Sequence, residues 1–209
     1  MQRSTAAPDT VDPTPPSRPL RRDAAENQER VLAAATAVFG REGREVSMAA
    51  IAAEAGVGVG TLYRRYPTRE SLLEALTQRS FEMVLAAAER ASTSAATAIA
   101  ALEGFYDDTI AHRSELVLPL HGGPQELAGV SRRLQQKIHD TLAELLTRGR
   151  REHTVRDDAT AEDIIAFGAL LAHTLAPDEW WVRSLHRQKQ IYLAGLAPRP
   201  TALAGSHVQ

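Results

Sequence analysis

The sequence contains no cysteine among its 209 residues. This absence excludes disulfide bonds, thiolate nucleophiles, zinc sites with cysteine ligands and iron–sulfur clusters. No apolar run approaches the roughly 20 residues that are needed to cross a bilayer, and the N-terminus is rich in proline and arginine instead of carrying an apolar signal core. We therefore expect a cytoplasmic protein with no membrane segment.

The motifs of several enzyme classes are also missing. The GVGVG run at 56–60 follows no predicted strand, no GxSxG elbow occurs, and the seven histidines all lie beyond residue 111 without an HExxH pattern. Glu103, Asp107, Asp108 and His112 could share one helix face, which permits a metal or acid–base site, but a solvated face is the favoured interpretation. We expect no enzyme, no cofactor and no metal site.

Helical periodicity runs through most of the chain. Hydrophobic residues make up 44% and charged residues 24%, which is typical of a globular protein, and the formal net charge is −2. Apolar residues recur at helical spacing, for example at Val31, Leu32, Ala35, Val38 and Phe39, and no convincing strand pattern or repeat appears. The predicted fold class is all-α.

Two short helices are expected between residues 47 and 66. Ser47 is suited to cap the first, which stops at Gly56, and the second runs from Gly58 towards Pro67. A helix pair joined by a tight glycine turn, with a third helix before it, lets the second helix lie in the DNA major groove while the first braces it. We therefore predict a three-helix helix-turn-helix domain over residues 23–70.

The outward face of the second short helix suits nucleic acid. Leu62 is expected to point inward, whereas short, hydroxyl-bearing or cationic side chains point outward, namely Val59, Thr61, Tyr63, Arg64 and Arg65. From Ala55 to Arg69 there are three arginines and no acid, so this face is locally positive. A packing corner without DNA contact is the alternative.

The same residues resemble a known family. The run RVLAAATAVF at 30–39, Gly43, and the run SMAAIAAEAGVGVGTLYRRYPTR at 47–69 closely resemble the N-terminal DNA-binding domain of the TetR family of bacterial transcriptional regulators. The resemblance implies that Thr61 and Tyr63 contact phosphates and that Val59 and Gly60 approach bases or backbone. It also implies that Ser47 caps its helix against the DNA backbone and that Arg69 meets a phosphate.

Some positions depart from the family pattern. Gly58, Arg65 and Tyr66 stand where the family commonly has other residues, which leaves the operator sequence open. The GVGVGTLYRR run, together with the WW pair at 180–181 and YLAGL at 192–196, also resembles the subgroup with SbtR-like C-terminal domains.

The chain outside this domain is divided by composition. Residues 1–22 hold Pro8, Pro13, Pro15, Pro16 and Pro19 and are predicted to be a flexible arm, and residues 198–209 a flexible tail. Arg18–Arg22 could reach a neighbouring minor groove, although a solvated tail is the favoured interpretation. Residues 71–197 are predicted to form a larger helical domain for ligand binding and dimerisation, as the resemblance implies.

Two sets of residues are candidates for these roles. A ligand cavity is expected to be lined by Phe105, Ile110, Leu116, His121, Phe167 and His173. A four-helix dimer interface is expected to involve Ile164, Phe167, Leu171, Trp181, Leu185 and Tyr192, unless these residues complete the core of the monomer.

These predictions combine into one functional hypothesis. We expect a homodimeric repressor that binds a palindromic operator in double-stranded DNA and is released by a small-molecule effector. An activator would differ only in the downstream consequence. A helical small-molecule-binding protein or enzyme without DNA binding is the alternative from a different class, and salt-dependent DNA affinity discriminates between the two.

Overall fold

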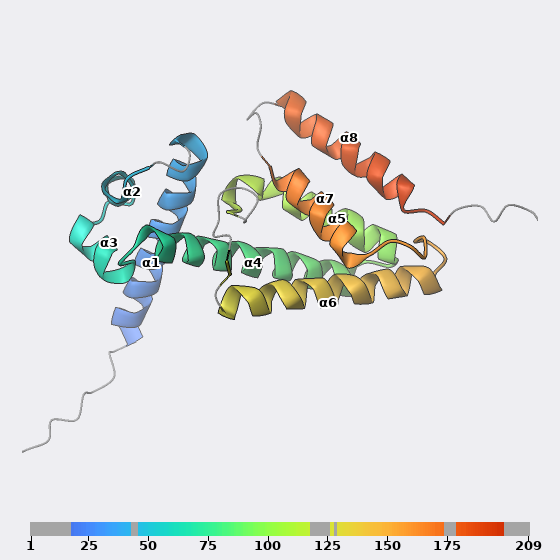
Figure 1. Ribbon diagram of the computed structural model, residues 1–209, viewed down its shortest axis with the longest axis horizontal. Coiled ribbons are helices and arrows are strands. Elements are labelled where there is room, and N and C mark those ends of the chain that lie inside the picture. Colours follow the sequence, from blue (N-terminus) through green and yellow to red (C-terminus); the bar gives the residue numbers. More distant parts are fainter. Residues whose placement is uncertain (1–17, 43–45, 118–125, 128, 174–178, 199–209) are drawn as a thin grey trace, which may run out of the picture.

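The computed structural model describes residues 18–42, 46–117, 126–127, 129–173 and 179–198. Within these ranges the chain is helical and contains no strand (Figure 1). The helices are α1 (Arg18–Glu42), α2 (Met48–Glu54), α3 (Val59–Arg65), α4 (Arg69–Ser94), α5 (Ala98–Ala111), the short 3-10 helix η1 (Arg113–Glu115), α6 (Gly129–Arg151), α7 (Ala161–Ala172) and α8 (Glu179–Gly195). The predicted all-α class is confirmed. None of the described helices is both long enough and apolar enough to span a membrane.

Helix α1 begins earlier than the sequence analysis predicted. It starts at Arg18, so residues 18–22, which belong to the predicted flexible arm, have helical backbone. Pro19 lies in the first turn, where its fixed φ favours the helix and its missing N–H removes no helical hydrogen bond. The remainder of the predicted arm, and the predicted tail beyond Pro198, lie outside the described residues.

A small hydrophobic core joins α1, α2 and α3 to the start of α4. The stripe predicted on α1 is buried at Val31, Leu32, Ala35 and Val38. It packs with apolar residues of the other three helices, including Ile51, Ala52, Leu62, Leu72 and Leu76. This core fixes the two short helices against α1.

Helix α4 belongs to both halves of the molecule (Figure 1). Its N-terminus is closed by a capping box: the Ser71 N–H donates to Thr68 Oγ1 at 3.1 Å, and the Thr68 N–H donates to Ser71 Oγ at 3.2 Å. Leu76 lies in the small core, whereas Phe81 and Leu85, further along α4, lie in a second and larger core. A single helix therefore links the two cores.

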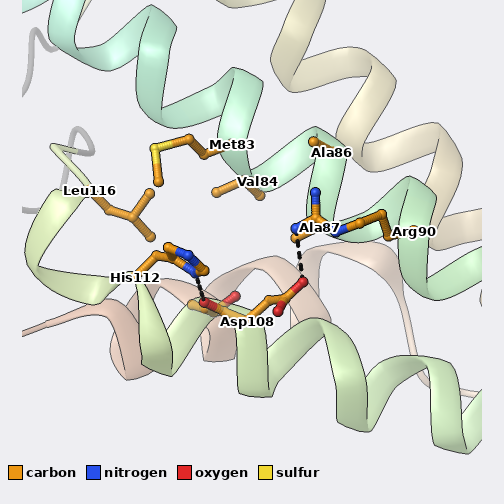
Figure 2. A pocket seen from close by; sticks show the side chains of 9 residues that line it. Met83, Val84, Ala86, Ala87, Arg90, Asp108, His112 and Leu116 are labelled. Atoms are coloured by element: carbon orange, nitrogen blue, oxygen red, sulfur yellow. Dashed lines mark hydrogen bonds and ion pairs between the residues drawn. The ribbon is translucent and has the colours of Figure 1, made fainter. Parts of the chain in front are cut away.

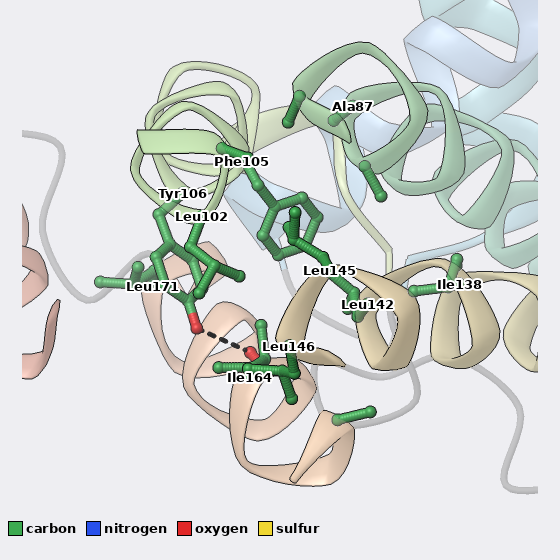
Figure 3. Packing of buried hydrophobic residues seen from close by; sticks show 14 of the residues in the cluster. Ala87, Leu102, Phe105, Tyr106, Ile138, Leu142, Leu145, Leu146, Ile164 and Leu171 are labelled. Carbon is green, nitrogen blue, oxygen red and sulfur yellow. Dashed lines mark hydrogen bonds between the residues drawn. The ribbon is translucent and has the colours of Figure 1, made fainter. Parts of the chain in front are cut away.

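The larger core is formed by α4 to α8. Figure 3 shows the packing of its residues from α4, α5, α6 and α7. Tyr106 of α5 is its largest fully buried side chain and donates its hydroxyl to the carbonyl oxygen of Ile164 on α7 at 3.2 Å. Burial raises the pKa of this phenol far above its ordinary value. The Tyr106 ring also meets Phe167 and Tyr192 edge-on, so α5, α7 and α8 are held together at one point.

A buried lysine attaches α8 to α5. Only 4% of the Lys189 side chain is exposed, and its Nζ donates to Asp107 Oδ1 at 2.7 Å and to Glu103 Oε1 at 3.2 Å. Gln190 also donates to Glu103 Oε1, at 2.6 Å. Hydrogen bonds from Gln190 and then from Lys189 lower the pKa of Glu103. Glu103 and Asp107, two of the candidate metal or acid–base groups, therefore form an ion pair with Lys189 between helices α5 and α8.

The segment after α5 touches both cores. Leu116 is buried in the larger core, and the next residue, Val117, is buried in the small one. The backbone of Val117 is held by two hydroxyls of α4: its N–H donates to Ser80 Oγ at 2.8 Å, and its carbonyl accepts from Thr77 Oγ1 at 3.2 Å. Two neighbouring residues thus join the two halves.

Candidate nucleic-acid interface

Helices α2 and α3 form a compact helix-turn-helix. Ser47 caps α2 by accepting a hydrogen bond from the Ala50 N–H at 3.1 Å, which confirms its predicted N-cap position. Gly56 adopts a positive φ of 65°, a conformation that is unfavourable for residues with a Cβ. The Val57 N–H then donates to the Ala52 carbonyl at 3.0 Å, which closes the turn and directs α3 across α2.

Helix α3 has one inward and one outward face. Leu62 is buried in the small core, while Val59 and Tyr63 are 42% and 47% exposed, although both are large and apolar in part. Gly60, Arg64 and Arg65 are exposed as well, and Thr61 is half-buried. The inward position of Leu62 and the exposed positions of Val59, Tyr63, Arg64 and Arg65 agree with the orientations predicted for α3.

The exposed face of α3 carries arginines, and two acids near it, Glu54 and Glu29, are paired with arginines outside α3. Glu54, at the end of α2, accepts from Arg41 of α1 at 3.1 Å, and Glu29 of α1 pairs with Arg79 of α4 at 2.6 Å. Arg64, in contrast, donates only to a neutral group in the described contacts, Thr61 Oγ1 at 3.0 Å on the same helix turn. Cationic and hydroxyl groups therefore stand side by side on the exposed face, as phosphate binding requires.

The C-terminal end of α3 is tied to α1. Arg65 Nη2 donates to Gln28 Oε1 at 2.5 Å, and both side chains are on the surface. The following residue, Tyr66, is buried in the small core, and this burial raises the pKa of its phenol. Tyr66 therefore anchors the end of the helix, while Arg65 bridges α3 and α1.

The family resemblance implies that Arg69 meets a phosphate, but its side chain contacts other parts of the protein. Its Nη1 donates to the carbonyl of Val46, and its Cζ lies 5.0 Å from the centre of the Phe39 ring. Its Nη2 is buried and has no hydrogen-bond partner among the described residues. The guanidinium is therefore turned towards α1 and the entrance of α2, away from the exposed face of α3.

Cavities lie between the helices of the larger half. One of about 220 Å³ is walled by α4 and α5 and has Arg90, Asp108 and His112 at its edge (Figure 2). Arg90 pairs with Asp108 at 2.9 Å, and His112 Nδ1 lies 2.9 Å from the Asp108 carbonyl oxygen. A second cavity of about 70 Å³ lies deeper, and both are lined by Val84, Thr109 and Leu116.

The predicted cavity residues are only partly brought together. Phe105 and Leu116 line the deeper cavity. Ile110 is buried in the core without lining either cavity, Phe167 lines a separate surface hollow beside Tyr192, and His173 is exposed at the end of α7. His121 lies outside the described residues. Thr109 of α5 and His112, which follows the end of α5, are not among the predicted cavity residues. Their spacing of three residues is the sequence signal that could have indicated a shared wall.

Three of the predicted dimer residues are core residues instead. Ile164, Leu171 and Leu185 are buried within the chain, because they form the inward stripes of α7 and α8. Phe167, Trp181 and Tyr192 are partly buried against the same core, and the Phe167 and Tyr192 rings stack at 3.9 Å. The large apolar residues that α7 and α8 leave exposed are Leu170, Trp180 and Ile191, at 65%, 63% and 53%.

Comparisons of sequence find similar proteins for the N-terminal part of the chain. Residues 31–76 match the family described as bacterial regulatory proteins, tetR family. Over 67 residues, 32% of the chain, the sequence is 39% identical to an HTH-type transcriptional regulator of Staphylococcus aureus. This match spans 36% of the length of that curated relative.

Comparisons of structure extend over the whole fold. The TetR transcription regulatory protein from Mycobacterium vanbaalenii is 30% identical with a TM-score of 0.59, and the match covers 86% of this chain and 99% of that one. A TetR transcriptional regulator from Streptomyces coelicolor is 25% identical with a TM-score of 0.58, covering 83% and 99% of the two chains. A tetR-family regulatory protein from Rhodococcus, 19% identical with a TM-score of 0.65, shares the fold over 84% of this chain and 99% of its own.

Proposed function

Because this chain belongs to the TetR family of bacterial regulatory proteins, we propose that it binds operator DNA and regulates transcription. The observation that carries the proposal is the exposed face of α3, where Val59, Thr61, Tyr63 and Arg64 stand outward on a helix braced by α2. Side chains of these kinds bind phosphates and base edges. Operator binding also requires the cytoplasmic location that the sequence analysis predicts.

A DNA-binding experiment tests this proposal. Sites would be selected from random DNA by the purified protein, and affinity would be measured by gel shift over a series of salt concentrations. We expect the logarithm of the affinity to fall linearly with the logarithm of salt concentration, because neutralised phosphates release counterions. Tyr63→Ala should weaken binding about tenfold, which corresponds to one lost hydrogen bond to a charged group of about 1.5 kcal/mol.

A matched variant controls for loss of folding. Arg183→Ala removes an exposed side chain of α8 whose partner is Glu179, far along the chain from α3. This variant should bind DNA like the unaltered protein. Unchanged affinity in Tyr63→Ala, or DNA binding without salt dependence, would contradict the proposal.

We further propose that the protein acts as a homodimer on a palindromic operator. Support comes from the three exposed apolar residues of α7 and α8, since large apolar side chains on neighbouring helices are suited to cover one another in a second copy. Two recognition helices about 34 to 36 Å apart would meet successive major grooves. Leu170→Arg should convert the dimer to a monomer, as measured by analytical ultracentrifugation. If the double variant with Leu170→Arg and Trp180→Arg is still a dimer, this surface is not the dimer interface.

The cavities between α4, α5 and α7 support release by an effector. They are mainly apolar with a few polar groups at the edge, as small-molecule sites are. Leu116 lines both, and its neighbour Val117 packs in the core beneath the DNA-binding helices. A ligand that displaces Leu116 would therefore favour a different position of those helices and lower operator affinity, as expected of a repressor that is released by its effector.

A carrier or enzyme without DNA binding is the second candidate, and the same cavities favour it. The two candidates differ in the DNA experiment. Tight binding of a small molecule combined with no salt-dependent DNA affinity would establish the carrier or enzyme in place of the regulator.

A further inference from the structure

Arg69 occupies a position that its charge does not favour. It is the first residue of α4, where the helix dipole repels a cation, and the capping box of Thr68 and Ser71 already closes this end of the helix. The side chain therefore contributes little to α4 itself. Its contacts lie elsewhere, on the Phe39 ring of α1 and the Val46 carbonyl.

These contacts connect the elements on both sides of α3. Val46 immediately precedes Ser47, the N-cap of α2, and Phe39 lies in the last turns of α1. The α2–turn–α3 unit runs from this anchor to Tyr66, which is buried three residues before Arg69. A guanidinium that stacks on a ring and donates to a carbonyl is directional in both contacts, so it fixes the start of α4 relative to the start of α2.

We propose that Arg69 is a positioning residue that sets the angle at which α3 meets DNA, in place of the phosphate contact that the family resemblance implies. The guanidinium is partly buried, and its Nη2 has no accessible surface to offer a phosphate. The exposed residues Arg64 and Tyr63 of α3 bind the phosphates instead. This inference rests on the proposed DNA binding, and it identifies which arginine side chains contact the DNA phosphates.

The salt dependence of DNA affinity separates the two roles. Each neutralised phosphate contributes about 0.9 to the slope of log affinity against log salt. Arg64→Met should reduce the slope by about one such contribution. Arg69→Met should leave the slope equal to that of the unaltered protein while lowering affinity by the same factor at every salt concentration. A slope reduced in Arg69→Met as in Arg64→Met would overturn the proposal.

A conservative variant adds an independent readout. Arg69→Lys keeps the positive charge, which is sufficient for a phosphate contact, but it lacks the planar group that stacks on Phe39 and donates sideways. We expect Arg69→Lys to bind DNA nearly as weakly as Arg69→Met. Full recovery of affinity by lysine would show that charge alone matters and would contradict a positioning role.

The contact itself can be tested without DNA. Arg69→Met and Phe39→Leu should each lower the unfolding midpoint in urea, and the double variant should lose less than the sum of the two, because both remove one interaction. Additive losses would overturn the inference even if the protein binds DNA. If the unaltered protein shows no salt-dependent DNA binding, the proposed function fails instead, while this coupling still reports on Arg69.

Discussion

At the scale of single residues, exposure divides the aromatic and cationic side chains near α3 into two groups. Tyr63 and Arg64 are exposed, and the described contacts give them no partner outside α3, whereas Tyr66 and Arg69 are turned into the fold. Residues of the same type therefore differ in role within seven positions. Tyr63 and Arg64 lie on the outward face of α3, whereas Tyr66 follows the end of α3 and Arg69 begins α4.

Val59 is expected to influence which bases are preferred. It is the first residue of α3 and has no charge or hydrogen-bonding side chain, so its contact with DNA can only be apolar, as with a thymine methyl group. Val59→Ser should change the preferred base at one or two positions of the selected site by about 1 to 3 kcal/mol per position. Sequencing of selected DNA measures this, and the salt slope should stay unchanged. An identical base profile would place Val59 away from the bases.

The lowered pKa of Glu103 predicts that the stability of the protein depends on pH. Its pKa is lowered in the folded protein by Gln190 and Lys189, so its contribution to stability is complete above the ordinary glutamate pKa and is lost as pH falls through the folded value. The free energy of unfolding should therefore decrease on acidification below about pH 4.5. In Glu103→Gln this decrease should be smaller in urea titrations at several pH values. An equal decrease in both proteins would mean that other carboxylates account for it.

At the scale of elements, the turn between α2 and α3 depends on one glycine. Gly56→Ala forces a Cβ into the left-handed region at φ 65° and should lower the free energy of unfolding by about 1 to 2 kcal/mol. Gly60→Ala is the matched control, because Gly60 lies inside α3 and an added Cβ there meets no atom within 4 Å. This control should raise stability by about 0.5 to 1 kcal/mol. Equal effects in thermal unfolding would contradict this reading of the turn.

The helices themselves could be predicted from the sequence because their signals are local. Ser47, Thr68 and Gly56 act on groups within a few residues, and the structure shows Ser47 and Thr68 as caps and Gly56 with positive φ. The sequence does not reveal the start of α1, because Pro19 and its neighbours have a composition that is typical of disordered segments, although proline is compatible with a first helical turn.

Contacts between distant residues could not be predicted in this way. Arg69 reaches a carbonyl 23 residues earlier, and Lys189 reaches carboxylates more than 80 residues away. Helical periodicity identifies an apolar stripe on α7, but it does not say whether Ile164 and Leu171 face the chain's own core or a second copy. Packing decides this, since α5 and α6 cover that stripe and leave Leu170 exposed.

At the scale of the whole molecule, two cores share one helix and one short segment. Arg79 of α4 pairs with Glu29 of α1 at 2.6 Å and with Glu115 of η1 at 3.4 Å, beside the buried hydrogen bonds of Val117. The DNA-binding helices are thus connected to the cavity walls by a few adjacent interactions. Because η1 contacts both α1 and α4, movement of η1 should disturb both helices.

Ser80→Ala tests whether this segment couples the two halves. The variant leaves the buried N–H of Val117 without its acceptor, which should lower the free energy of unfolding by about 1 to 3 kcal/mol. Because Leu116 and Val117 belong to different cores, amide hydrogen exchange should accelerate in both α1 and α5. Thr93→Ala, which removes an exposed hydroxyl near the end of the same helix, should affect neither. Faster exchange confined to one half would mean that the halves respond independently, and an effector in the cavity would then need another route to the DNA-binding helices.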